Sequence, residues 1–403
     1  MSDLDQRYRR YRDAVRDEPL PLGLVDLDAL ERNVDTLVAP VKQVGKTLRV
    51  ASKSVRSVDL LRRIAARGGP TVRGVMAFSA AEAAYLAAEG FSDILVAYPS
   101  AQPRDARLVA EANRAAVVAI VADAPEHLAV LSAAAVAAGT RVPVLADVDV
   151  SYRPLGDRLH VGVRRSPLRA PGPIADFVEA IGRAPGLVFG GLMAYEAHLA
   201  GVPDDNPLAP LLDGPKRAMK RLARVPVRAQ RDAVVRELGR RGIAVPLFNG
   251  GGTGSVAWSA ADPALTEVAV GSGFLDSHLF DGYRGLALSP AACFALQVTR
   301  RPGPGYVTCQ GGGFVASGAA GPDRLPIPYL PAGLRLTGLE GAGEVQTPLL
   351  VPAGLTLELG APVFFRHAKA GELAEHVASY LLLRGDHLEG RAVTYRGAGH
   401  CFA

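Results

Sequence analysis

Eight short apolar runs alternate with segments of helical composition over about 225 residues, and this alternation limits the possible folds more than any other feature. The runs cover residues 48–51, 74–78, 94–97, 117–122, 142–150, 187–193, 243–248 and 268–270. Three of the segments between them, 80–89, 103–112 and 125–138, have the composition of helices. Continuous apolar character is typical of parallel strands that are buried on both faces. The pattern predicts an α/β fold with a parallel (β/α)8 barrel, and a doubly wound sheet is the alternative because periodicity alone does not close a barrel.

The chain beyond residue 280 follows a different pattern. Gly- and Pro-rich turns separate short strand-like runs such as 295–298 and 355–359, which predicts an antiparallel β domain with one helix over 371–384. A short strand near Leu24 and Val25 precedes a helix over 27–37, which Asp26 or Asp28 can cap. We expect that strand to join the β domain. The predicted domains are therefore 26–280 for the barrel and 1–25 plus 281–403 for the mainly β part.

Charge and composition exclude several classes of function. The net charge is +5, but residues 216–242 hold ten Lys and Arg against two acids, so the rest of the chain is −3. This basic segment keeps apolar residues at helical spacing, so we interpret it as a solvated barrel helix and expect no nucleic-acid partner. Three scattered cysteines, no signal peptide and no apolar run of membrane-spanning length predict a cytoplasmic protein without a membrane partner.

Candidate chemistry lies where the barrel strands end, because catalytic groups of such barrels gather at the C-terminal ends of the strands. Lys53 follows the first strand, and it is either a surface lysine or a Schiff-base nucleophile. Glycine-rich turns, 250–255 and 271–273, follow strands seven and eight, where barrels commonly bind phosphate. Each turn alone is also compatible with a tight loop. Together with Lys53 they predict a phosphate-bearing aldehyde cofactor, and pyridoxal 5′-phosphate meets both demands.

With these residues in place the sequence resembles the fold-type III pyridoxal-phosphate enzymes of the alanine racemase superfamily. It is most similar to their D-threonine aldolase/D-serine dehydratase branch, which includes proteins described as amino acid deaminase/aldolase. The similarity covers nearly the whole chain. It rests on residues 24–30 with Asn33, on 51–54, 191–198, 250–255 and 271–273, and on 365–369.

The resemblance implies roles for individual positions. Lys53 is expected to hold the cofactor as an aldimine and to act as a base at Cα. Tyr195 is expected near the pyridine nitrogen, and a packed aromatic ring at the barrel mouth is the alternative. His198 either faces the substrate or caps its loop. The expected phosphate-binding residues are Gly251, Gly252, Thr253, Ser272 and Gly273.

Two departures from the family pattern stand out. Relatives carry an arginine two residues before the Gly-Val that follows strand five, near the cofactor's phenolic oxygen, whereas this chain has His160 there. Arg153, Arg158 and Arg164 are possible substitutes, and the sequence does not choose among them.

The second departure concerns metal. Relatives bind a divalent cation through a His-x-Asp or His-x-Cys pair, and this chain has His367 and Lys369 at that spacing. A lysine ammonium cannot ligate a metal, so we expect no metal site and a Lys369 charge in place of the cation. The alternative is a shifted zinc site in which His400 and Cys401 join His367.

The resemblance implies a lyase that acts on a small β-hydroxy-α-amino acid, presumed to be of D configuration. It works by retro-aldol cleavage or by dehydration, with His367 as base and Lys369 as acid or cation. A racemase or epimerase is the alternative, and it needs a second base such as Tyr283, Tyr306, Tyr329 or Tyr380. A cofactor carrier is a third possibility, which the residues after 280 argue against. The family also implies a homodimer.

Overall fold

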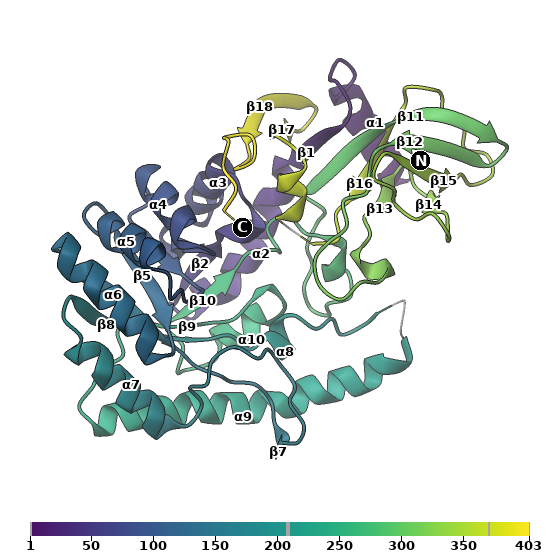
Figure 1. Cartoon of the computed structure of the whole chain (residues 1–403). Coiled ribbons are helices and arrows are strands. Elements are labelled where there is room, and N and C mark those ends of the chain that lie inside the picture. Colours follow the sequence, from purple (N-terminus) through teal and green to yellow (C-terminus); the bar gives the residue numbers. More distant parts are fainter. Residues whose placement is uncertain (1, 207–209, 370, 403) are drawn as a thin grey trace. The chain divides into compact units, whose positions relative to one another are not determined.

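Eight parallel strands close into a barrel, and all of them belong to one of two compact units into which the chain divides (Figure 1). The computed structural model describes residues 2–206, 210–369 and 371–402. The barrel unit takes the described residues of Leu37–Lys53, Gly68–Gly271 and Phe402–Ala403. The sheet unit takes those of Met1–Thr36, Ser54–Arg67 and Ser272–Cys401. The closed barrel confirms the predicted fold and rules out the doubly wound sheet.

The barrel strands follow one another around the ring in chain order, and β10 pairs with β2 to close it. They are β2 Thr47–Ala51, β3 Val72–Ala77, β4 Asp93–Val96, β5 Val117–Ala122, β6 Val142–Asp147, β8 Leu187–Ala194, β9 Phe248–Gly250 and β10 Glu267–Val270. Seven of them coincide closely with the predicted runs. The strand predicted over 243–248 is wrong in position, because β9 begins only at Phe248. Pro246 lacks the N–H that a ladder needs, so pairing starts after it.

The helices of this region alternate with the strands as the pattern requires. They are α2 Leu27–Gln43, α3 Val58–Gly68, α4 Ala80–Ala88, α5 Pro103–Ala112, α6 Pro125–Ala138, α7 Pro171–Arg183, α8 Ala197–Ala200, α9 Asp213–Arg240 and α10 Val256–Ala260. The oxygen Asp26 Oδ1 accepts a hydrogen bond from the N–H of Ala29 at 3.1 Å, so Asp26 is the cap of α2. The short β7 Pro154–Asp157 lies between β6 and α7 and is exposed.

Long helix α9 confirms the helix expected from the basic segment, with one difference. Most of its charged residues face solvent, but Arg231 is completely buried. A buried guanidinium needs buried partners, because an unpaired charge in the interior is very costly. Those partners belong to the candidate site described below.

The barrel interior contains both an apolar layer and an ion-paired layer. Leu95, Val121 and Leu145 belong to the apolar cluster. Arg49 of β2 donates to Glu267 of β10 and to Asp93 of β4, each at 2.7 Å. The two carboxylates flank the buried guanidinium and compensate its charge, and Asp93 also pairs with Arg73 at 3.5 Å.

The sheet unit is built on one nine-stranded sheet. Its strands are β1 Leu22–Asp26, β11 Ala292–Gly303, β12 Tyr306–Gln310, β13 Ile327–Leu330, β14 Arg335–Leu336, β15 Gln346–Leu350, β16 Pro362–Arg366, β17 Ser379–Arg384 and β18 His387–Val393. Strand β1 pairs antiparallel with β11, where Leu24 faces Cys293, and parallel with β17, where it faces Leu381. The prediction that the first strand joins the C-terminal β domain is thereby confirmed.

Helix α1 Asp3–Ala14 covers part of this sheet and was not expected from the sequence. Ser2 and Asp5 form a capping box at its start. Tyr11 is buried in the same apolar cluster as Leu24 and Phe364, and its ring meets Phe364 edge to face at 5.4 Å. The helix is therefore anchored on the sheet by its aromatic face.

Two predictions for this unit are wrong. Residues 371–384 do not form one helix: a 3₁₀ turn, Glu372–Glu375, precedes strand β17. Residues Ser379–Arg384, with the sequence Ser-Tyr-Leu-Leu-Leu-Arg, pair with both β1 and β18. Sheet pairing therefore overrides helix propensity. Residues 355–359 form no strand, because they lie between Gly354 and Gly360, both at φ +85°, and Leu359 is exposed.

The two units do not follow the predicted domain boundaries residue by residue, since residues 27–36 and 54–67 group with the sheet. The boundaries at residues 26 and 280 remain a prediction. None of the described helices combines the length and the hydropathy that a membrane span requires.

Candidate active site

Lys53 lies at the carboxyl end of β2, in the short 3₁₀ turn Ser52–Ser54, and its side chain is exposed. The amine Nζ donates a hydrogen bond to the hydroxyl of Tyr98 at 3.0 Å and lies 5.6 Å from the centre of the Tyr98 ring. Ser52 is buried and donates to the carbonyl oxygen of Met76 at 2.8 Å, which fixes the turn against β3. The backbone thus presents a reachable primary amine at the mouth of the barrel.

Tyr195 follows β8 and joins the same cluster through Arg165. The guanidinium carbon of Arg165 lies 5.4 Å from the centre of the Tyr195 ring and 5.6 Å from that of Tyr98. Burial, followed by the charge of Glu196, raises the pKa of Tyr195 to about 12. The phenol therefore stays protonated at neutral pH and acts as a neutral hydrogen-bonding group.

The glycine turn after β9 has no room for side chains at its first positions. A Cβ on Gly252 would lie 2.8 Å from Ala200 Cβ and 3.2 Å from Tyr195 Cε2. One on Gly251 would lie 2.5 Å from a methyl of Val268, and its φ of +85° also favours glycine. Bare backbone therefore passes directly beside the Tyr195 ring.

A buried ion pair holds this turn. Gly251 N–H donates to Glu196 Oε2 at 3.0 Å, and Ser255 Oγ donates to Glu196 Oε1 at 2.7 Å. Arg231 and Ser259 also bond to Glu196, and both charged residues are fully buried. Burial opposes ionisation of Glu196, but the Arg231 charge and the serine hydroxyls outweigh it and keep its pKa below the ordinary value.

The backbone donors of the two glycines are thus committed within the protein. The N–H of Gly252 donates to Ser255 Oγ at 3.2 Å, and that of Gly251 is held by Glu196. In this structure these groups shape the turn rather than face an anion. The predicted phosphate contacts of Gly251, Gly252 and the buried Thr253 remain predictions.

His198 is buried one helical turn beyond Tyr195. Its Nε2 has no hydrogen-bond partner among the described residues, and burial lowers the pKa of His198 to about 4. A Cβ on Gly162 would lie 3.3 Å from its Nδ1. The imidazole is therefore neutral at physiological pH and closely packed against the loop after β6.

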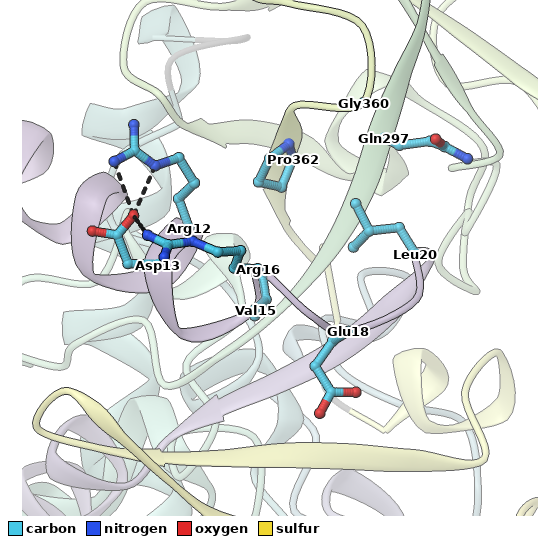
Figure 2. Close-up of a pocket in the computed structure, with 9 residues that line it drawn as sticks. All are labelled: Arg12, Asp13, Val15, Arg16, Glu18, Leu20, Gln297, Gly360 and Pro362. Carbon is cyan, nitrogen blue, oxygen red and sulfur yellow. Dashed lines mark hydrogen bonds and ion pairs between the residues drawn. The ribbon is translucent and has the colours of Figure 1, made fainter.

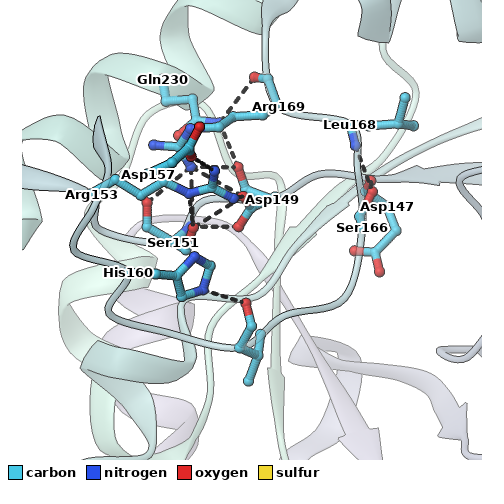
Figure 3. A network of polar contacts seen from close by, with 11 residues as sticks. Asp147, Asp149, Ser151, Arg153, Asp157, His160, Ser166, Leu168, Arg169 and Gln230 are labelled. Carbon is cyan, nitrogen blue, oxygen red and sulfur yellow. Dashed lines mark hydrogen bonds and ion pairs between the residues drawn. The ribbon is translucent and has the colours of Figure 1, made fainter. Parts of the chain in front are cut away.

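That loop is organised by Asp149 (Figure 3). Asp149 accepts hydrogen bonds from Arg153 at 2.6 Å and from Arg169 at 3.2 Å, and Ser151 donates to it from its backbone and its hydroxyl. Within the same loop, Nε2 of His160 lies 3.1 Å from the carbonyl oxygen of Val163. Arg153, one of the substitutes considered for the missing arginine, is therefore already paired with a carboxylate.

Asp147, at the end of β6, forms no ion pair within 4 Å among the described residues. Burial, followed by the nearby charges of Asp123 and Asp149, raises the pKa of Asp147 to about 7, although Arg165 opposes the shift. Asp147, Arg165 and Tyr195 line a narrow cavity of about 10 Å³. The barrel mouth therefore carries a carboxyl group that titrates near neutrality.

The predicted site residues of the sheet unit, Ser272, His367 and Lys369, have different neighbours and different degrees of burial. The hydroxyl oxygen of Ser272 lies 3.1 Å from that of Ser54, and Gly273 follows it in the turn after β10. His367 is buried, and neither ring nitrogen has a hydrogen-bond partner among the described residues. Burial, then the charges of Arg366 and His278, lower the pKa of His367 to about 3.

Lys369 is exposed, and its Nζ donates to Ser317 Oγ at 2.7 Å. Within the described parts of the chain, no three His, Cys, Asp or Glu side chains are grouped so that they can hold a metal ion. His367, His400 and Cys401 are therefore not assembled into the zinc site that was the alternative. Whether the protein uses a metal stays untested.

A separate open pocket of about 430 Å³ lies in the sheet unit between the end of α1 and β16 (Figure 2). Arg12 and Arg16 border it, but both bond to Asp13, at 2.9 and 3.4 Å. The charges of this pocket are largely balanced, so it offers no distinct chemistry.

The sequence interpretation missed three contributors to the barrel site. Tyr98 follows β4 just as Lys53 follows β2, so the rule of strand ends could have found it. Arg165 lies one residue beyond the arginine that was considered. Glu196 sits beside Tyr195, and only the buried Arg231 on α9 reveals its role.

The fold is a closed (β/α)8 barrel within a chain that also holds a separate, mainly antiparallel sheet unit, as in alanine racemase-like proteins. The chain belongs to the family described as alanine racemase, N-terminal domain, which matches residues 25–275. Membership in this family supports pyridoxal 5′-phosphate as the cofactor.

Two curated relatives and one solved structure show how similar the chain is to characterised proteins. It is 28% identical over 259 residues to the 3-hydroxy-D-aspartate aldolase of Paracoccus denitrificans (strain Pd 1222), covering 64% of this chain and 60% of that relative. It is 26% identical over 312 residues to the D-threonine aldolase of an Arthrobacter species, covering 76% and 74% of the two chains. The crystal structure of D-threonine aldolase from Filomicrobium marinum superposes with a TM-score of 0.79 at 21% identity, covering 94% and 95%.

Proposed function

We propose that this protein is a pyridoxal-phosphate-dependent lyase that cleaves a D-configured β-hydroxy-α-amino acid into glycine and an aldehyde. The observation that carries the proposal is the exposed Lys53 amine beside the Tyr98 hydroxyl at the barrel mouth, with Tyr195 and a bare glycine turn in the same unit. The names of the curated relatives supply the substrate class and support a lyase over the racemase alternative.

The residues present fit the cofactor. An aldehyde needs a primary amine that is reachable from the mouth, which Lys53 provides. A flat ring needs an aromatic neighbour and a close backbone approach, and the missing Cβ at Gly252 leaves that space beside Tyr195. When bound, the cofactor supplies an electron sink for the negative charge that develops at Cα.

The chain's own side chains supply binding and proton transfer. Tyr98 orients the Lys53 amine through its hydroxyl, and Tyr195, which stays protonated, gives a neutral hydrogen bond that does not add charge near the ring nitrogen. Cleavage of Cα–Cβ requires that the β-hydroxyl proton passes to a base, while Lys53 Nζ returns a proton to Cα. His367 as that base and Lys369 as the cation at the β-oxygen remain predictions. Dehydration to a keto acid is the alternative outcome when the β-oxygen is protonated instead.

The test begins with the absorbance spectrum of the purified protein, before and after borohydride. The expected result is a visible band that borohydride abolishes and that a Lys53→Ala variant lacks. If the wild-type protein shows no band even after pyridoxal phosphate is added, the proposal is wrong.

Product analysis then separates the reactions. With D-threonine or D-3-hydroxyaspartate, aldehyde and glycine indicate the aldolase, whereas keto acid and ammonia indicate the dehydratase. Inversion of a single enantiomer with Cα exchange in deuterated water indicates a racemase. The same assays after chelation, and after each divalent cation is restored, measure whether a metal takes part.

Sedimentation of the loaded protein tests the predicted homodimer. Fractionation of the producing cells tests the predicted cytoplasmic location. Nucleic-acid binding that persists at high salt would contradict the expectation of no nucleic-acid partner.

A further inference from the structure

Arg165 differs from Arg153 and Arg169, two other arginines of the loop after β6. Arg153 and Arg169 both bond to Asp149, so their charges are compensated within the loop. Arg165 has no ion pair or side-chain hydrogen bond among the described residues, although it lies on the same excursion of the chain. Its positive charge is therefore available to a bound anion.

The surroundings of Arg165 hold it in one place without neutralising it. The guanidinium lies over two tyrosine rings, at 5.6 Å from Tyr98 and 5.4 Å from Tyr195. A contact with an aromatic ring does not use the N–H donors of a guanidinium as an ion pair does, so these donors remain for a ligand. Burial raises the pKa of Asp147, which lines the same small cavity, to about 7, so this carboxyl group is only partly ionised at neutral pH and compensates the Arg165 charge incompletely.

Arg165 and the reactive amine of Lys53 contact the same tyrosine. The Tyr98 ring is approached by two cations, Arg165 and Lys53, each at 5.6 Å from the ring centre. His160, which occupies the place where relatives carry an arginine, is engaged with Val163 instead. A planar donor with an open edge, next to an amine, is the arrangement that recognises a planar oxyanion.

We propose that Arg165 binds an anionic oxygen beside Lys53, carried either by the cofactor ring as its phenolate or by the substrate as its α-carboxylate. This inference rests on the proposed function and adds to it the residue that recognises the negative charge at the reacting end. Arg165 is then a direct binding residue of the site.

The experiment compares Arg165→Gln and Arg165→Lys with Arg164→Gln, a matched control. Arg164 is exposed, adjacent in sequence, and contacts neither tyrosine. Three quantities are measured: the dissociation constant of pyridoxal phosphate for the apoprotein, the midpoint pH of the visible band, and spectral titrations of the loaded protein. The titrations use D-alanine, which has the carboxylate but no β-hydroxyl, and ethylamine, which lacks the carboxylate.

Two results support the inference and tell the two sources apart. If the phenolate is the ligand, Arg165→Gln weakens cofactor binding roughly 10- to 100-fold and shifts the midpoint pH upward, because the anion loses its cation. If the carboxylate is the ligand, D-alanine binding weakens roughly 10- to 100-fold while ethylamine binding is unchanged. In either case Arg165→Lys, which keeps the charge without the planar fork, lies between Arg165→Gln and the wild type.

The inference is overturned if Arg165→Gln and Arg164→Gln give the same values in all three measurements. Should Arg165→Gln fail to fold, Arg165→Lys alone decides, and behaviour equal to the wild type counts against the inference. If the wild-type protein takes up no pyridoxal phosphate, the proposed function fails and this inference with it. Normal loading with no effect of Arg165 rejects only the inference.

Discussion

At the scale of single residues, the barrel site depends on the absence of a side chain at Gly252. Gly252 brings bare backbone to within contact of Tyr195 and Ala200, and any larger residue would collide with both. The turn is tight against its neighbours, so a change of a single methyl group is expected to be felt.

We expect Gly252→Ala to weaken pyridoxal phosphate binding roughly tenfold or more and to cost about 1–3 kcal/mol of unfolding free energy, because the added methyl displaces Tyr195 or Ala200. Fluorescence titration with the cofactor and urea unfolding measure the two effects. Gly239→Ala is the control, since nothing lies within 4 Å of a Cβ there and α9 gains helix propensity. Wild-type affinity in Gly252→Ala would show that the turn can yield without cost.

Lys53 and Tyr195 were predictable from the sequence because each follows a strand at the same end of the barrel. Tyr98 obeys the same rule but has no glycine motif or resemblance to single it out. Arg165 could not be chosen, because three neighbouring arginines are equally plausible until their carboxylate partners are known. Pairing between distant residues is set by packing, which one sequence does not record.

At the scale of elements, α9 and the turn after β9 act as one assembly. Arg231 donates to the carbonyl oxygen of Ala194 at 2.8 Å and to Asp262 at 3.0 Å, and it also pairs with Glu196. A helix near the middle of the chain therefore ties together the ends of β8 and β9 and the start of β10. The pattern of basic and apolar residues in α9 predicted the helix, but it did not indicate that Arg231 is buried.

Arg231→Met is expected to destabilise the protein by about 3–5 kcal/mol, because it leaves Glu196 and Asp262 buried without their cation. Arg236→Ala removes an exposed pair with Asp232 on the same helix and is expected to cost at most about 1 kcal/mol. Urea unfolding of both variants makes the comparison. Equal losses would mean that the buried pair adds nothing beyond a surface pair.

Six of the eight barrel strands were predicted to within two residues at each end, β6 ends three residues earlier than predicted, β9 was misplaced, and β17 was mistaken for part of a helix. Its residues have no helix-breaking signal, and it pairs both with the following strand β18 and with β1, about 360 residues earlier. Local propensity is a weak guide when the partner is that distant in sequence.

At the scale of the whole molecule, two buried imidazoles connect stability to pH. Burial lowers the pKa of His198 to about 4 and that of His367 to about 3, below the ordinary value of 6.5. The unfolded chain therefore binds more protons than the folded chain between pH 6.5 and these values. Their contribution is complete above pH 6.5 and is lost as the pH falls.

Asp147, whose pKa is raised to about 7, acts in the opposite sense, so the contribution of His198 is measured as a difference between variant and wild type. Between pH 6.5 and 4 we expect the wild type to lose up to about 3 kcal/mol more unfolding free energy than His198→Gln. Urea unfolding at a series of pH values measures it. His387→Gln, on the exposed part of β18, serves as the control and should leave the slope unchanged. A His198→Gln profile parallel to the wild type would contradict the assignment.

Strand β1 sits in the interior of its sheet, between β11 and β17, although it is made near the start of the chain. Leu24 leaves the ribosome about 270 residues before Cys293, which is roughly 15–50 seconds of synthesis at usual rates. During that time the edges of β1 have no partners, while the barrel strands can already pair with one another. We therefore expect β1 to find its place in the sheet only after the strands of the barrel have formed.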